Sequence, residues 1–249
     1  MKLSKKIKFQ ADDFGYNKEA SFLIFNLKKK KKIINFSCLT NFLKKRKEFI
    51  KLIKKEKIAL HVNLIEGRPI SNKNSIYTLV NKKGNFYPLP IFLIKLSFGK
   101  IDLDHVYKEI ENQIKFLLNN NLIIVELNSH QHIHALSPIA DIFLELAKKY
   151  NIKNIRSYKN IYSLTIEGRI KYLITKLFAF ISEIIFNKRL GLPKTWEIED
   201  KAKTIFLSWE GRNFDFNRLN DNYYKIIIHP GLPFDKNKKY LKFFNKQYE

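Results

Sequence analysis

Short apolar runs alternate with helical patterns along most of the chain, and this alternation limits the fold more than any other feature. The expected strands cover residues 7–11, 33–39, 58–64, 122–127, 152–156, 204–209 and 224–228. The expected helices between them cover residues 17–30, 42–55, 104–118, 138–150 and most of 160–190. Repeated strand–helix units predict an α/β fold with a parallel sheet or a (β/α) barrel. We find no repeat, linker or change in composition, so we expect one domain over residues 1–249.

Residues 65–90 interrupt the alternation with a stretch rich in Gly and Pro, which predicts a long loop. Long irregular insertions are often functional, so we expect this loop and the region 160–190 to shape a substrate pocket. Residues 170–186 are the most apolar helical stretch, but Lys171, Lys176 and Glu183 interrupt them. This predicts a core-facing helix rather than a membrane span, with a helix that lies on a membrane surface as the alternative. The stretch also leaves room for a lipid-linked substrate.

The chain is strongly basic, with 47 Lys and Arg against 23 Asp and Glu and a net charge of +24. Such a charge raises the question of nucleic acid or an anionic membrane surface. Only seven of the basic residues are Arg, which binds phosphate better than Lys does. We therefore interpret the excess as solvated Lys on helix surfaces and expect no nucleic-acid partner.

Cysteine content and the first residues bear on the compartment. The single cysteine, Cys38, lies in an apolar run, which indicates a buried structural thiol and is compatible with a reducing compartment. The basic residues 1–8 are followed by Asp12 and Asp13 rather than by an apolar stretch, unlike a signal peptide. We therefore expect a cytoplasmic protein.

Acidic residues and histidines gather in four motifs, each directly after an expected strand. The motifs are ADDFG at 11–15, HVN at 61–63, NSHQHIH at 128–134 and HPG at 229–231. In parallel α/β folds the active site forms at the carboxyl ends of the strands. The sequence therefore predicts that these four motifs meet at one site.

The side chains within the motifs suggest metal chemistry. Extended backbone would turn Asp12 and Asp13 to opposite sides, so that one could bind a metal while the other approaches substrate; a turn or helix cap is the alternative. Extended backbone would also place His130, His132 and His134 on one face, and a polar turn before Pro138 is the alternative.

Single histidines carry less information. His61 could equally be a structural residue of its strand, and His229 is well placed as an acid or base. His105, at the start of a helix, looks incidental. One Asp with two His suits zinc or another divalent metal that keeps open positions for water. A spare carboxylate could then take a proton from that water, and a spare His could give one to the leaving group.

At these motifs the chain resembles the YdjC-like carbohydrate deacetylases, a family that includes chitooligosaccharide deacetylases. The family carries ADDFG at its first strand, a His after its third, D-S-H-x-H-x-H followed by Pro, and a late H-P-G or H-P-A. This chain shows ADDFG, His61, NSHQHIH and HPG in the same order. The resemblance covers the chain to about residue 231.

The resemblance implies a distorted (β/α) barrel, similar to a TIM barrel and related to polysaccharide deacetylases. It implies an enzyme that removes the acetyl group from an N-acetylated amino sugar or glycan, free or lipid-linked. It also implies metal ligands Asp13, His61 and His130, magnesium or zinc as the metal, Asp12 as general base, His229 as general acid and His132 at the substrate. A homodimer is compatible with this reading.

The chain departs from the family pattern in three places. Asn128 stands where the family usually has Asp, so an amide would replace a carboxylate beside a ligand His. Gln10 precedes ADDFG, and 18 residues follow Gly231, from which we expect the last barrel unit to be missing or replaced. Two other functions stay open: a metal-dependent hydrolase of another bond, such as a phosphoester, and a catalytically inactive carbohydrate-binding homologue.

Overall fold

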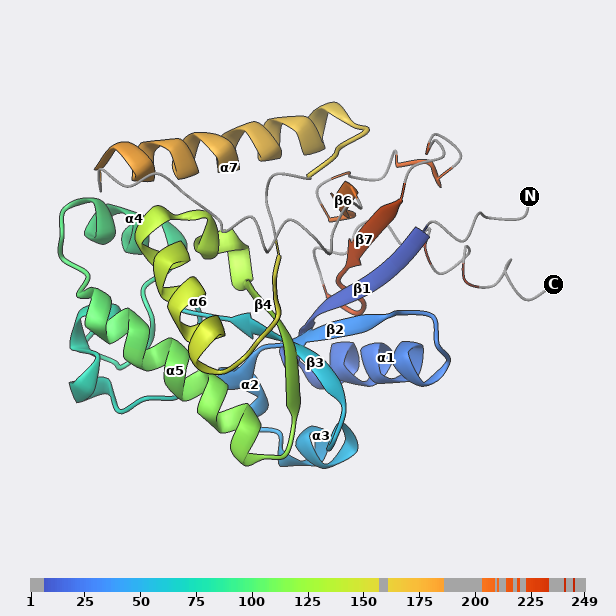
Figure 1. Cartoon of the computed structure of the whole chain (residues 1–249), viewed down its shortest axis with the longest axis horizontal. Coiled ribbons are helices and arrows are strands. Elements are labelled where there is room, and N and C mark those ends of the chain that lie inside the picture. The colour runs from blue at the N-terminus through green and yellow to red at the C-terminus, as the bar shows by residue number, and fades with distance from the viewer. Residues whose placement is uncertain are drawn as a thin grey trace.

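All seven strands of the sheet run parallel, in the order β5-β4-β3-β2-β1-β7-β6. The computed structural model (Figure 1) describes residues 7–156, 161–185, 203–208, 210, 214–216, 219, 223–232, 240 and 244. The strands are β1 (Ile7–Phe14), β2 (Asn35–Cys38), β3 (Lys57–Val62), β4 (Ile123–Ser129), β5 (Asn154–Ile155), β6 (Lys203–Phe206) and β7 (Tyr224–Ile228). The alternation in the sequence therefore predicted the sheet correctly.

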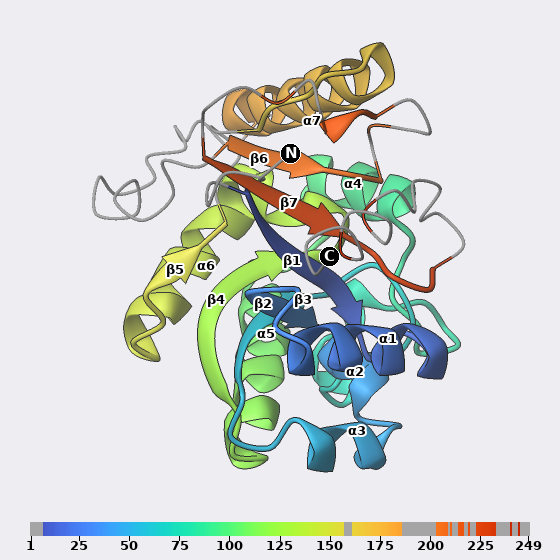
Figure 2. The ribbon, with the colours of Figure 1, turned by 90° about the vertical axis from the view of Figure 1, so that its right-hand side faces the viewer.

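The helices flank the outside of the strands (Figure 2). They are α1 (Lys18–Lys29), α2 (Thr40–Leu43), α3 (Lys47–Leu52), α4 (Leu89–Ser97), α5 (Leu103–Asn119), α6 (Ser137–Lys149) and α7 (Ile166–Ile185). Local chemistry sets the helix starts: the Asn17 side chain accepts a hydrogen bond from the Ala20 amide at 2.7 Å, and α6 has Pro138 in its first turn. Their inner faces and the strands form one large apolar core.

The residues next to the two edge strands of the sheet, β5 and β6, lie close together in the sequence. The Arg156 amide, directly after β5, donates to the Leu127 carbonyl, whereas Ile161 forms a parallel bridge with Thr204 of β6. From Arg156 to Ile161 the chain advances by five residues, which span at most about 18 Å when fully extended. In a flat sheet the same two positions would lie about 34 Å apart, at about 4.8 Å per strand. The sheet therefore has to curl.

Contacts across the sheet show the same curvature. Lys225 of β7 lies 2.9 Å from Glu126 of β4, although three strands separate these two in the order. Gln10 of β1 also donates to Glu126, at 3.0 Å. Such contacts between non-neighbouring strands require a curved inner face. The predicted distorted (β/α) barrel is confirmed.

Helices α2, α3 and α4 differ from the expectation. The helix predicted over 42–55 is instead two short helices, α2 and α3, because the Arg46 guanidinium between them donates to the carbonyls of Gly15 and Phe42 at 2.9 and 3.2 Å. This tertiary contact outweighs helical periodicity. Helix α4 was not expected at all, although Pro90 in its first turn was a usable signal.

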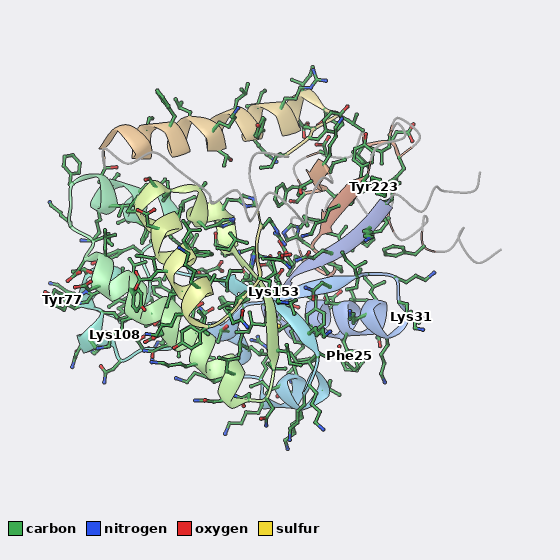
Figure 3. All side chains as sticks on the ribbon, viewed as in Figure 1. Phe25, Lys31, Tyr77, Lys108, Lys153 and Tyr223 are labelled. Atoms are coloured by element: carbon green, nitrogen blue, oxygen red, sulfur yellow. The ribbon has the colours of Figure 1, made fainter. Side chains whose placement is uncertain are left out.

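The stretch 65–90 is irregular as predicted, with two short 3₁₀ turns, η1 (Lys73–Ser75) and η2 (Tyr77–Leu79). Its apolar residues Ile76, Leu79 and Phe86 are buried, so the loop packs on the domain. Lysines such as Lys31, Lys108 and Lys153, labelled in Figure 3, are exposed. Among the described residues, no helix combines the length and apolarity needed to cross a membrane.

Candidate active site

Asp12 and Asp13, near the end of β1, differ in backbone conformation. Asp13 has a left-handed backbone with φ of 68°, a conformation that costs energy for a non-glycine residue, so the expected extended backbone ends at Asp12. Gly15 follows with φ of 98°, and a Cβ there would lie 3.1 Å from the Leu43 Cβ. Close packing of α2 on this turn therefore holds the motif in place.

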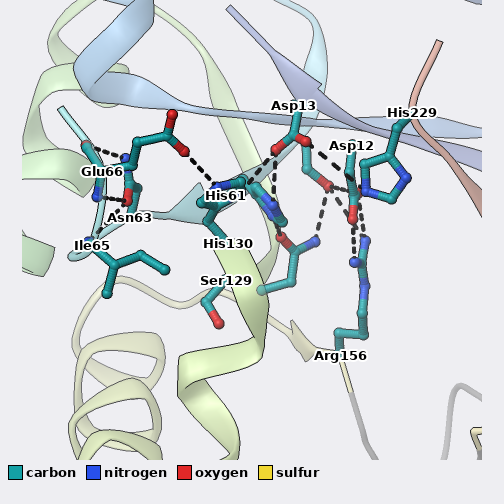
Figure 4. Close-up of polar contacts among 12 residues, drawn as sticks. Asp12, Asp13, His61, Asn63, Ile65, Glu66, Ser129, His130, Arg156 and His229 are labelled. Carbon is teal, nitrogen blue, oxygen red and sulfur yellow. Dashed lines mark hydrogen bonds and ion pairs between the residues drawn. The ribbon is translucent and has the colours of Figure 1, made fainter. Parts of the chain in front are cut away.

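Asp13 meets two histidines from neighbouring strands. Its Oδ1 lies 3.2 Å from Nε2 of His61 at the end of β3 and 3.2 Å from Nδ1 of His130 after β4 (Figure 4). One ligand atom from each of the three residues lies within 4.8 Å of the others, and all three side chains are buried. Oδ1 of Asp13 accepts no hydrogen bond of normal geometry from the described residues. One oxygen and two imidazole nitrogens converging on a buried point fit a divalent metal.

The electrostatics of Asp13 and His130 also favour a bound cation. Burial alone would raise the pKa of Asp13, but His130 and His61 hold that pKa well below its usual value. Burial alone would lower the pKa of His130, but the Asp13 carboxylate and Glu66 raise it to about 10. A cation is therefore favoured at this point, whether it is a proton on His130 or a metal ion.

Each histidine of this group is oriented by a side chain on its other nitrogen. Nδ1 of His61 lies 2.5 Å from Oδ1 of Asn128, and Nε2 of His130 lies 3.0 Å from Oε2 of Glu66. Glu66 also accepts a hydrogen bond from the Tyr16 hydroxyl at 2.8 Å. Such partners fix the tautomer and orientation of metal-binding imidazoles. Asn128 thus occupies the place of a carboxylate partner, as the family resemblance implied.

Glu126 gives a reason for an amide at position 128. The Asn128 Nδ2 donates to Oε1 of Glu126 at 2.6 Å and to the Ser37 hydroxyl at 2.9 Å. An Asp would place a second buried carboxylate oxygen against Glu126, with nothing to donate between them. The departure from the family pattern therefore suits the charges around it.

Asn128→Asp is accordingly expected to weaken the fold rather than improve the site. We expect the free energy of unfolding, measured in urea, to fall by about 1–3 kcal/mol. Metal affinity, measured by calorimetry, should stay close to that of the wild type, because His61 keeps an acceptor. The companion Asn128→Ala removes that acceptor and should lower metal affinity by about 10–100-fold. An Asn128→Asp protein as stable as the wild type would refute this explanation.

Asp12 faces the inside of the barrel and is held by an arginine. Arg156 donates from Nη1 to Oδ2 at 2.5 Å and from Nη2 to Oδ1 at 2.8 Å, and Ser37 donates to Oδ1 at 2.6 Å. Burial alone would raise the pKa of Asp12, but the charge and hydrogen bonds of Arg156 keep it below its usual value. Asp12 is therefore a fixed carboxylate at neutral pH.

Behind this pair lies a buried polar network that the sequence did not reveal. Glu126 approaches Lys225 at 2.9 Å and Arg156 at 3.4 Å, and its carboxylate also accepts from Gln10 and Asn128. All five side chains are buried. The network links the base of the site to strands on both sides of the barrel.

The remaining histidines divide into cavity residues and structural residues. His229, after β7, lies 4.0 Å from Oδ2 of Asp13, and burial lowers its pKa despite the neighbouring carboxylates. His132 lines the cavity with its ring 4.5 Å from that of Phe206. His134 instead contacts Ser129 and the Arg156 carbonyl and stacks on Phe143.

The prediction of extended backbone through these three histidines was wrong. Residues His130–Ala135 form a 3₁₀ segment, η3, in which Gln131 and His132 have positive φ values of 48° and 60°. This turn sends His130 toward Asp13 and His134 into the core. His105 lies outside this group, against Thr78 and Tyr77, as expected for an incidental residue.

A cavity of about 500 Å³ opens beside the Asp13 group. It is lined by Asp12, Asp13, Tyr16, His61, Glu66, Ser129, His130, Gln131, His132, Lys171, Ser208 and His229. All six residues singled out from the sequence are among them. Glu66, Tyr16 and Lys171 were not foreseen, and neither was Arg156 behind Asp12. Arg156 could have been found, because it ends an expected strand and so lies at the same edge as the motifs.

Comparisons with known proteins agree with this geometry. The carbohydrate deacetylase of Thermoanaerobacter pseudethanolicus is 29% identical over 147 residues, covering 57% of this chain and 56% of that protein. The carbohydrate deacetylase of Danio rerio is 29% identical over 154 residues, covering 61% of this chain and 49% of that protein. The chain thus spans about half the length of these curated relatives.

The fold is shared with a solved structure described as a cellobiose-phosphate cleavage protein of Enterococcus faecalis V583. The TM-score is 0.56 at 18% identity, with 97% of this chain and 85% of that chain covered. The model of the family described as YdjC-like protein matches residues 6–248, almost the whole sequence. The chain therefore belongs to the YdjC-like protein family.

Proposed function

We propose that this protein is a metal-dependent hydrolase that removes the acetyl group from an N-acetylated amino sugar or oligosaccharide. The observation that carries the proposal is the convergence of Asp13, His61 and His130 beside a cavity that also holds Asp12 and His229. The relatives named carbohydrate deacetylase support the choice of substrate class.

In this proposal Asp13, His61 and His130 hold a divalent ion, Mg²⁺ or Zn²⁺. When bound, the ion supplies Lewis acidity, which polarises the acetyl carbonyl and acidifies water. Asn128 and Glu66 keep the two imidazoles turned toward that position. His132, on the cavity wall, contacts the sugar.

Asp12 and His229 transfer the protons. Asp12 stays ionised, and its Oδ2, which accepts from Nη1 of Arg156, has a second lone pair that accepts a proton from the attacking water. The water oxygen bonds to the carbonyl carbon, the carbon–nitrogen bond breaks, and His229 donates a proton to the departing amine. His229 has to carry this proton before the step, and because burial lowers its pKa it does so in the smaller share of molecules at neutral pH. The products are acetate and a free amino sugar.

The test is to measure bound metal and acetate release from N-acetylglucosamine oligomers, with and without added divalent metal. His130→Ala removes one ligand and should lose both the metal and, by at least about 10²-fold, the acetate release. His105→Ala is the matched control, because His105 lies outside the cavity lining, and it should behave as the wild type.

The outcomes separate the competing functions. Metal-dependent acetate release that is lost in His130→Ala supports the deacetylase. Bound metal with phosphate release from sugar phosphates and no acetate would indicate a phosphoester hydrolase instead. A folded protein that takes up no metal would overturn the metal centre and favour a binding protein.

A further inference from the structure

Helix α7 presents an apolar face away from the protein. Its large apolar residues recur at intervals of three and four, so they share one side of the helix. They are exposed by between 39% and 76%: Ile166, Ile170, Leu173, Ile174, Leu177, Phe180 and Ile181. The opposite side holds the buried Gly168 and the half-buried Tyr172 and Thr175, and α7 contacts α6 and η3. Surface helices usually turn their apolar side toward the core, whereas α7 turns its apolar side toward solvent. We call these seven residues the apolar face of α7.

The position of α7 makes this face accessible. In both ribbon views α7 is the outermost element on its side of the molecule, far from α3 (Figures 1 and 2). Contiguous apolar surface of this kind marks a site of interaction, unlike single exposed apolar residues. Lys171, on the inner side of α7, lines the cavity of the candidate active site. What covers the apolar face therefore lies on the helix that supplies Lys171 to the cavity wall.

Charge decides between the candidates for that cover. The protein has a net charge of +24, so two copies brought together face to face would repel one another. An anionic lipid surface would instead attract the protein, and Arg169 and Lys176, which border the apolar face, could reach the headgroups. Glu167 borders the other edge, so the charges beside the apolar stripe are mostly but not all basic. An apolar stripe with mostly basic borders is the pattern of helices that lie in the membrane interface.

We propose that the apolar face of α7 docks on an anionic lipid surface, with the helix lying in the plane of the interface. Docking needs no catalysis, so it stands apart from the proposed function. If both hold, the cavity opens beside the lipid surface, where a lipid-linked sugar would be presented.

The test is flotation of the full chain with vesicles of phosphatidylcholine and phosphatidylglycerol, and with phosphatidylcholine alone. The wild type should bind the anionic vesicles and bind the neutral ones more weakly. Leu173→Asp/Leu177→Asp should lower binding by at least about tenfold, because it puts two charges on the apolar face. The control Ile34→Asp/Leu52→Asp changes two residues outside α7, one just before β2 and one in α3, that are each 45% exposed, and it should bind as the wild type.

Three results would overturn the proposal. They are no binding to anionic vesicles, equal binding by the α7 variant, and a stable dimer in light scattering that the α7 variant dissociates. If the α7 variant does not fold, Leu177→Cys provides a second test, because the natural Cys38 is buried. A polarity-sensitive fluorophore on the introduced thiol should shift to the blue with anionic vesicles, and an unchanged spectrum would contradict docking.

Discussion

Asp12→Asn is expected to keep its bound metal and to release acetate about 10²–10⁴-fold more slowly than the wild type. Asp12 belongs to the cavity lining but not to the group of Asp13, His61 and His130, which is proposed to hold the metal. An amide cannot accept the proton of the attacking water, whereas the ligand atoms of Asp13, His61 and His130 stay in place. Acetate release and metal content measured on the same preparation test this directly.

Two further variants make the result for Asp12 interpretable. Ser37→Ala removes a neutral hydrogen bond to Asp12 and leaves the carboxylate, so it should lose far less activity. Asp12→Asn leaves the buried Arg156 without its counter-charge and could unfold the protein. The double variant Asp12→Asn/Arg156→Met removes both charges and keeps the test valid. Acetate release near the wild-type rate in a folded Asp12 variant would exclude Asp12 as the base.

Glu126→Gln is expected to lower the free energy of unfolding by about 3–5 kcal/mol, the largest stability loss we expect from one substitution. Glu126 is buried, and it balances Lys225 at 2.9 Å and Arg156 at 3.4 Å. Without its charge, two buried cations lose a shared partner while their desolvation remains. Unfolding in urea, followed by circular dichroism, measures the change.

The control for this variant is Glu111→Gln. Glu111 also forms two ion pairs, each of 2.7 Å, with Lys115 and Lys149, but both of these lysines are about half exposed. Water screens such surface pairs, so this loss should be much smaller. Equal losses in the two variants would show that burial does not matter to the network.

The effect of Glu126 should also depend on pH. Burial alone would raise its pKa, but Lys225 and Arg156 lower it from 4.5 to about 2. A carboxyl group with a lower pKa in the folded state adds stability above its unfolded pKa and loses it as the pH falls through the folded value. The stability difference between the wild type and Glu126→Gln should therefore be constant near neutral pH and shrink between 4.5 and about 2.

Several features of the site could be predicted from the sequence because they depend on local order along the chain. Asp12, Asp13, His61, His130 and His229 each follow an apolar run, and parallel strands bring their carboxyl ends to one edge. Strand–helix alternation was enough to predict that edge. The motifs therefore indicated both the fold class and the residues that meet in the cavity.

Local periodicity was insufficient where a distant contact decides the conformation. Arg46 breaks an otherwise regular helical pattern by bonding to the carbonyl of Gly15. The turn at Gln131 and His132 separates three histidines whose spacing suggested one face. In each case a tertiary contact or a left-handed backbone outweighs a short-range pattern.

The sequence by itself determined the parallel α/β fold and the group of acidic and imidazole side chains at the strand ends, because both follow from hydrophobic patterning and chain order. Only the tertiary structure decided which charges balance one another. Glu126, Arg156 and Lys225 lie far apart in the chain and meet because the sheet curls. The same holds for α7, whose apolar residues were expected to face the core but point outward. Periodicity shows that a helix has an apolar side, whereas its packing partners decide which way that side faces.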